Sequence, residues 1–247
     1  MFYIKQLKNN RKAFMFNRKK SFAIILVLFG LAITTFYSCG DDTNTITNPP
    51  GETPYLTGTI TNYPGGSIIA KAKLTAGLPA DSFFAGIDTI DNSGMLNMDL
   101  ATPPANFLTS INDLTLPSGV VVSDTTARIA QIGTLRAYGF SNELIGMLQK
   151  KNFMDSVITG SFAVQYLYST KPFTITGSDT MASVNDTTIN IYNVSFVAGW
   201  NSFTVRAAER RPGYSRYEVI TGEAAGATWY YTTTTLDVLR KKNFLIN

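Results

Sequence analysis

The chain has 247 residues, of which 45% are hydrophobic, and its 21 basic and 17 acidic residues give a formal net charge of +4. Seven of the basic residues and no acid lie within the first 20 positions, so the chain from Cys39 onward holds 14 basic and 17 acidic residues. The overall basicity therefore does not indicate a nucleic-acid-binding surface. The lack of histidine excludes Ser-His and Cys-His catalytic sites and histidine-ligated metals.

The first 38 residues have the order of a secretory signal. A basic segment is followed by an apolar run from Phe22 to Tyr37 and by the small residue Ser38. The next residue, Cys39, is the only cysteine of the chain. Phe36-Tyr37-Ser38-Cys39 resembles the lipobox of bacterial lipoproteins, with Phe36 where that family prefers leucine. The resemblance implies a signal peptide over residues 1–38 and a diacylglycerol anchor on Cys39.

Two other interpretations of the apolar run remain. An uncleaved signal anchor is one, since the run of about 16 to 18 residues is at the short end for spanning a bilayer. A buried helix is the other, although no polar residue interrupts the run to create a second face. Gly40-Asp41-Asp42 resembles the export signal of surface-exposed lipoproteins in some Gram-negative bacteria. These resemblances imply an outer-membrane protein, periplasmic or surface-exposed, whose partner is the membrane through the acyl anchor at Cys39.

Residues 39–54 are rich in proline and short polar side chains, which predicts a disordered linker. Strand-forming segments and turn signals then alternate over residues 55–116. The strands are expected at 55–61, 67–75, 82–90 and 95–100. Gly58-Thr-Ile and Asn92-Ser-Gly-Met-Leu resemble the small transthyretin-like or carboxypeptidase-regulatory-like β-sandwiches. The resemblance implies an accessory β-sandwich domain without catalysis.

Residues 117–247 are predicted to form a second β-sandwich domain. Its strands are expected at 120–122, 127–138, 162–168, 173–177, 189–196, 203–207, 217–221 and 228–232. A change of alternation near Tyr192 predicts a β-bulge. A short helix is expected over 141–151, with Ser141 as its N-cap and two lysines at its C-terminus. The sequence therefore predicts an all-β protein with two antiparallel, Ig-like or transthyretin-like β-sandwich domains after a signal peptide and a flexible linker.

Aromatic and arginine side chains gather near the C-terminus. Aromatic rings stack on sugars or peptides while polar groups orient them, and turns project outward, so this region is the expected ligand site. The candidate ligand-binding residues are Trp200, Arg211, Tyr214, Tyr217 and Trp229. Core packing is the competing interpretation, because strand alternation buries about half of the rings in any sandwich.

Other chemistry is sparse in this sequence. Phosphate loops and dinucleotide fingerprints are absent, so no cofactor is expected. The segment 88–94 indicates a hairpin turn rather than a calcium loop. A glycosidase would need only two carboxylates, and Glu209, Glu218 and Glu223 are available, although surface charge explains them as well. We expect a lipid-anchored envelope protein with a non-catalytic structural, adhesive or ligand-binding role. The alternative is a carbohydrate-binding surface lipoprotein of a glycan-uptake system, so a glycan or an envelope protein is the expected partner.

Overall fold

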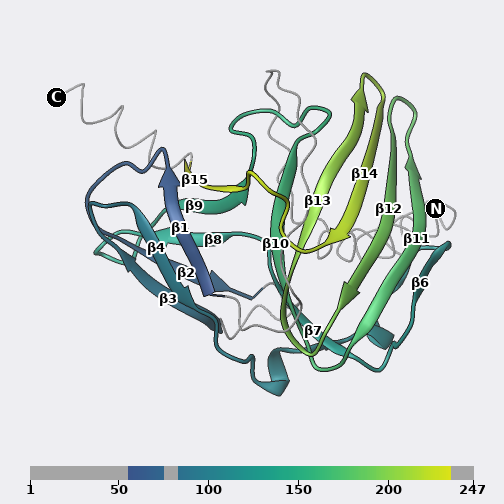
Figure 1. Cartoon of the computed structure of the whole chain (residues 1–247), viewed down its shortest axis with the longest axis horizontal. Coiled ribbons are helices and arrows are strands. Elements are labelled where there is room, and N and C mark those ends of the chain that lie inside the picture. The colour runs from purple at the N-terminus through teal and green to yellow at the C-terminus, as the bar shows by residue number, and fades with distance from the viewer. Residues whose placement is uncertain (1–54, 75–82, 235–247) are drawn as a thin grey trace, which may run out of the picture.

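A computed structural model describes residues 55–74 and 83–234, and strands dominate it (Figure 1). The all-β, sandwich-like prediction is confirmed. The strands join into one branched sheet rather than separate hydrogen-bonded sheets. The predicted signal peptide 1–38, the lipidated Cys39 and the linker 39–54 lie outside the described residues.

The described elements of residues 55–116 are short strands and two single turns of 3-10 helix. They are β1 (Tyr55–Thr61), β2 (Ile68–Lys73), β3 (Phe84–Ile90), β4 (Met95–Asp99), η1 (Ala105–Phe107), β5 (Thr109–Ser110) and η2 (Ile111–Asp113). The later strands are longer on average. They are β6 (Val120–Val122), β7 (Arg128–Ile132), β8 (Leu135–Tyr138), β9 (Leu144–Lys151), β10 (Phe162–Ser169), β11 (Phe173–Ala182), β12 (Thr187–Phe196), β13 (Gly199–Arg211), β14 (Tyr214–Thr221) and β15 (Thr228–Thr233).

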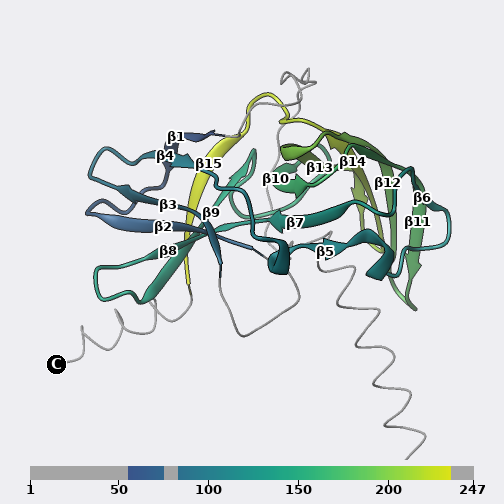
Figure 2. The same cartoon turned by 90° about the horizontal axis from the view of Figure 1, so that it is seen from below.

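One part of the sheet curls over on itself. Its strand order is β4-β1-β15-β9-β8-β2-β3, and β1 and β4 lie over β2, β3 and β8 (Figure 2). The turn predicted at 88–94 joins the two ends: Gly94, with φ +67°, donates its N–H to the carbonyl of Asp91. Ala101 N–H also donates to Ala85 O at 2.7 Å. The fold encloses a first core that includes Leu56, Ile90, Leu96, Leu148 and Trp229.

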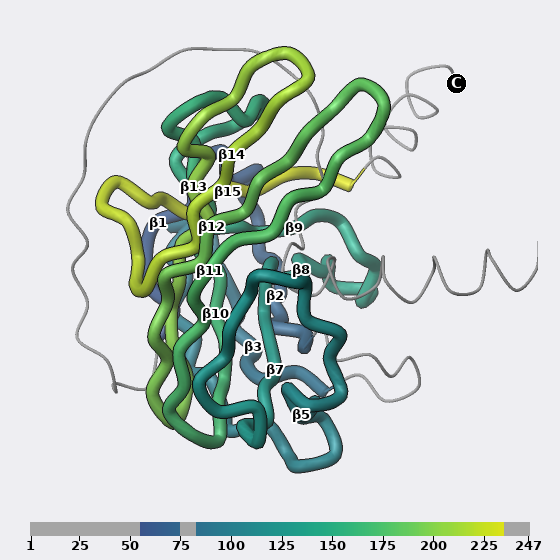
Figure 3. The backbone as a smooth tube through the Cα atoms, turned by 90° about the vertical axis from the view of Figure 1, so that its right-hand side faces the viewer, coloured from purple at the N-terminus to yellow at the C-terminus, as the bar shows by residue number. Residues whose placement is uncertain are grey.

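The other part is a sheet of five long strands and the short β6, in the order β10-β13-β14-β12-β11-β6. These strands run beside one another in Figure 1, and Figure 3 shows them from the side. Phe173, Tyr192 and Phe203 are buried on one of its faces, with residues of β7 and η2 packed against them. This second core is separate from the first in its residues. The first core nevertheless combines strands from both predicted domains, since Leu148 and Trp229 lie in it beside Leu56.

Strand β10 stands between the two cores. Val164 and Tyr166 belong to the first core and Leu167 to the second, because successive side chains of a strand point to opposite faces. Gln165 on the second face is fully buried and accepts a hydrogen bond from the amide of Gln131. Burial of both faces makes β10 an interior strand, with β13 on one edge and β7 and β9 on the other.

Hydrogen-bonded strands also cross the domain boundary predicted at residues 116–117. The pairs β1–β15, β2–β8 and β5–β7 each join a strand of 55–116 to one of the later strands. The pairs β1–β15 and β12–β14 are parallel, so the sheet is mixed where we expected antiparallel pairing throughout. The two halves therefore share backbone hydrogen bonds as well as strand β10.

The helix predicted over 141–151 is wrong, because residues 144–151 form strand β9. This segment pairs with β8 on one edge and with β15 on the other. Gly146, unfavourable in a helix, lies where the ring of Tyr231 crosses β9; a Cβ there would come within 2.5 Å of that ring. Tertiary pairing thus overrides the local helix signal.

The bulge predicted near Tyr192 is also wrong. Register between β11 and β12 runs without a shift from Phe173–Phe196 to Ala182–Thr187. Asn190 is fully buried in phase with Tyr192, whereas Ile191 is half-buried on the opposite face. The buried face of β12 thus keeps one phase from Asn190 onward, and the isoleucines, which lie on the other face, wrongly suggested a change of phase. A register shift is found in β13 instead, between Ala207 and Glu209.

Candidate functional site

Both tryptophans of the predicted ligand site are buried in the first core. Trp200 is 5% exposed, and its indole N–H donates to Ala101 O at 3.1 Å. Trp229 is 2% exposed, donates to Thr57 O at 3.2 Å and stacks on Tyr166 with 6.3 Å between ring centroids. The expectation that Trp200 projects outward from a turn is wrong, because β13 already begins at Gly199.

The other three predicted residues lie on the β13–β14 hairpin. Arg211 and Tyr214 are paired in register, with the guanidinium 4.7 Å from the ring centroid. Arg211 also forms an exposed ion pair with Glu209 at 3.3 Å. Tyr217 is buried in the second core, where its hydroxyl accepts a hydrogen bond from Arg210 at 3.4 Å. The structure therefore brings Arg211 and Tyr214 together but does not gather the five residues into one site.

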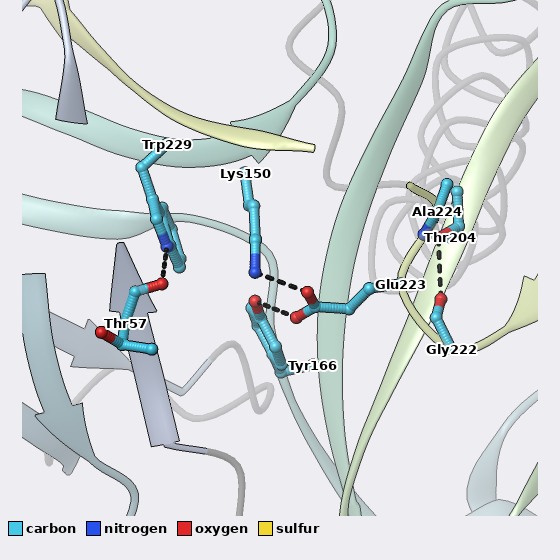
Figure 4. A network of polar contacts seen from close by, with 8 residues as sticks. All are labelled: Thr57, Lys150, Tyr166, Thr204, Gly222, Glu223, Ala224 and Trp229. Atoms are coloured by element: carbon cyan, nitrogen blue, oxygen red, sulfur yellow. Dashed lines mark hydrogen bonds and ion pairs between the residues drawn. The ribbon is translucent and has the colours of Figure 1, made fainter. Parts of the chain in front are cut away.

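A polar network lies beside Trp229 (Figure 4). Glu223 accepts a hydrogen bond from the hydroxyl of Tyr166 at 2.8 Å on one carboxylate oxygen. Its other oxygen contacts Lys150 Nζ at 2.5 Å. The side chains of Lys150 and Glu223 are only 18% and 20% exposed, so this ion pair is partly shielded from solvent.

The loop that carries Glu223 is fastened to β13 (Figure 4). Thr204 is fully buried; its hydroxyl donates to Gly222 O at 2.7 Å and accepts from Ala224 N–H at 3.0 Å. Gly222 has φ +84°, a conformation that glycine adopts without steric cost. These bonds on either side of Glu223 fix the direction of its carboxylate toward Lys150 and Tyr166.

Burial and the neighbouring carboxylate of Glu223 raise the pKa of the Tyr166 hydroxyl well above its ordinary value. This shift favours the protonated hydroxyl, which is the form that donates to Glu223. Because Lys150 and Tyr166 occupy both carboxylate oxygens of Glu223, we interpret this network as a structural connection between β9, β10 and the 222–227 loop.

A pocket of about 440 Å³ opens where β15 meets the end of β9 and the turn after β1. The residues that line it are Asn62, Pro64, Lys151, Met154, Asp155, Tyr230, Tyr231, Thr232 and Thr233. Asn62 donates from its side-chain amide to the sulfur of Met154 at 3.1 Å, which ties the turn to the 152–155 loop. The pocket thus combines residues from both halves of the chain.

Lys151 is the most distinctive residue of this pocket. It is 7% exposed, and its ammonium donates to Met154 O at 3.3 Å. The same group lies 4.7 Å from the ring centroid of Phe153 and 5.9 Å from that of Tyr230. Burial lowers the pKa of Lys151, and the negative charge of Asp155 opposes that shift. The protein therefore holds a poorly solvated cation at the wall of a pocket.

Comparison with known proteins leaves the function open. No protein-family model, curated protein or solved structure matches this chain. Within residues 55–74 and 83–234 there is no helix of the length and apolarity needed to cross a membrane. The same residues hold no group of three or more acidic or thiol side chains placed to bind a metal ion. The polar network of Glu223 and the pocket beside Lys151 are therefore the features that bear on function.

Sequence reasoning missed Lys151, Asp155 and Tyr230 as members of a site. The usable signal was the pair Lys150-Lys151, because consecutive residues of a strand face opposite sides and a strand covered on both faces must then bury part of both lysines. The predicted helix placed both lysines at its C-terminus instead. Nothing in the sequence marked Asn62 as a residue of a site, because asparagine is common in turns and the segment was interpreted as a turn.

Proposed function

We propose that this chain is a lipid-anchored protein of the cell envelope that binds a small polar ligand without catalysis. The Lys151 pocket is the observation that carries the proposal. Its volume of about 440 Å³ lies within the range of small-molecule sites, and polar groups line it together with an aromatic ring. This pocket favours ligand binding over a purely structural or adhesive role.

Carbohydrate is the ligand class that the pocket fits best, in line with a role in glycan uptake. Thr232 and Thr233 are exposed and offer hydroxyl groups, and Asn62 and Asp155 offer further hydrogen-bonding groups. Tyr230 is half-buried and adds an aromatic ring. Sugars need such a combination of an apolar ring face and many polar partners.

Binding is tested on a glycan array with the full chain in detergent. Met154 is 51% exposed at the pocket, so Met154→Trp is expected to obstruct the site and to reduce glycan binding at least about tenfold. Val184→Trp is the matched control, because it adds the same ring at a 98% exposed position outside the pocket. Absence of binding to any glycan, or an equal loss in both variants, would contradict the proposal.

The anchor is supported by the lipobox-like segment that ends at Cys39. Intact-mass analysis of protein from the membrane fraction is expected to show a chain that begins at Cys39 and carries acyl mass. The Cys39→Ser variant is expected to lose that mass, since the thiol is the attachment atom. An unprocessed N-terminus without acyl mass would instead support the signal-anchor interpretation.

A further inference from the structure

The two consecutive lysines at the end of β9 differ in burial and in their ion-pair partners. Lys150 faces inward and has the carboxylate of Glu223 at 2.5 Å. Lys151 faces the pocket and is more buried than Lys150, yet no carboxylate of the described residues lies within ion-pair distance of its Nζ atom. A buried charge is costly unless an opposite charge accompanies it. The fold thus gives Lys150 a close ion-pair partner, whereas the carboxylate of Asp155 acts on Lys151 only from beyond ion-pair distance.

The contacts that Lys151 does make are weak substitutes for an anion. A single carbonyl, that of Met154, accepts from its ammonium at 3.3 Å, and two aromatic rings lie at 4.7 and 5.9 Å. An ammonium can donate three hydrogen bonds, so it keeps donor capacity for a ligand. A ligand carboxylate bound there would gain a charge-assisted hydrogen bond and would offset the cost of burial.

The remaining polar groups restrict what kind of anion fits. Asp155 lines the same pocket, and its charge repels a doubly charged phosphate ester about twice as strongly as a single carboxylate at the same distance. Its carboxylate accepts hydrogen bonds from hydroxyl groups, as does the carbonyl oxygen of the Asn62 amide. The pocket therefore suits a ligand with one carboxylate and several hydroxyls.

We propose that the pocket selects acidic sugars, with the ammonium of Lys151 bound to the sugar carboxylate and Asp155 accepting from sugar hydroxyls. The ring of Tyr230 lines the same space and packs against the sugar ring. This inference rests on the proposed function, because it names the ligand class of the same pocket.

A glycan array of matched pairs tests the inference with the full chain in detergent. The two members of a pair differ only in a uronate carboxylate or the corresponding hydroxymethyl group, as in galacturonan and galactan oligosaccharides. Preferential binding of the acidic members is expected. Lys151→Met should remove that preference and weaken acidic binding about tenfold or more, whereas Lys171→Met, which removes an exposed lysine outside the pocket, should not.

Different outcomes separate this inference from the proposed function. Equal binding of both members of the pairs, unchanged in Lys151→Met, overturns the selectivity for acidic sugars and leaves carbohydrate binding in place. Binding of neither set overturns both. Urea unfolding of Lys151→Met checks that the variant is folded, and Lys151→Arg, which keeps the charge, is expected to retain the acidic preference if the variant is folded.

Discussion

Trp229→Ala is expected to lower the free energy of unfolding by about 4 kcal/mol, the range found when a large aromatic side chain is removed from a core. The indole is 2% exposed, stacks on Tyr166 and donates to Thr57 O. Gly58 in β1 has φ +143°, and a Cβ there would lie 3.1 Å from the indole. The β1 backbone is thus shaped around this ring, so its loss leaves a cavity and an unpaired carbonyl.

Urea unfolding of the full chain in detergent, followed by circular dichroism, measures this effect. Phe140→Ala serves as the control, because Phe140 is 81% exposed and its truncation is expected to change stability by less than about 0.5 kcal/mol. A Trp229→Ala variant with unchanged stability and lost glycan binding would instead support the interpretation of Trp229 as a ligand-stacking residue.

Most strands of this fold could be predicted because their alternation is local. Leu96, Met98 and Leu100 share a buried face, as the pattern of residues 95–100 indicated. The alternation of residues 162–168 predicted a strand, and this segment forms β10, which is buried on both faces. A period of two identifies a strand wherever its neighbours happen to lie.

Pairing between distant strands could not be predicted in this way. The segment that became β9 carries a capping serine and C-terminal lysines, which favour a helix locally. Its strand partners β8 and β15 decide otherwise, and β15 comes about 80 residues later in the chain. The parallel β1–β15 pair is likewise invisible in local sequence.

The same limit applies to the candidate site. Aromatic residues were expected to mark it, but Trp200 and Trp229 fill the core instead. The pocket is formed by Asn62, Lys151 and Tyr230, which only the pairing of β1, β15 and β9 brings together. Patterns in a single sequence indicate which faces are apolar, but they do not indicate a lysine that is buried beside a strand from another part of the chain.

Removal of the Glu223 carboxylate is the second change for which we expect a large effect. Glu223→Ala is expected to destabilise the protein by about 3 kcal/mol, because it leaves Lys150 without a counter-ion and the Tyr166 hydroxyl without an acceptor. Tyr166 is 3% exposed, so its hydroxyl has little contact with solvent in the intact protein. Glu223→Gln retains an acceptor for Tyr166 and is expected to cost less.

Urea unfolding again provides the measurement, with Glu209→Ala as the matched control. Glu209 also pairs with a basic residue, Arg211, but the two side chains are 38% and 64% exposed, and such surface pairs contribute at most about 1 kcal/mol. A double-mutant cycle with Lys150→Met isolates the pair itself. Because Lys150→Met also removes the partly buried cation, it is expected to make Glu223→Ala less costly than in the wild-type background. Equal costs in both backgrounds would show that Glu223 stabilises the fold through Tyr166 alone.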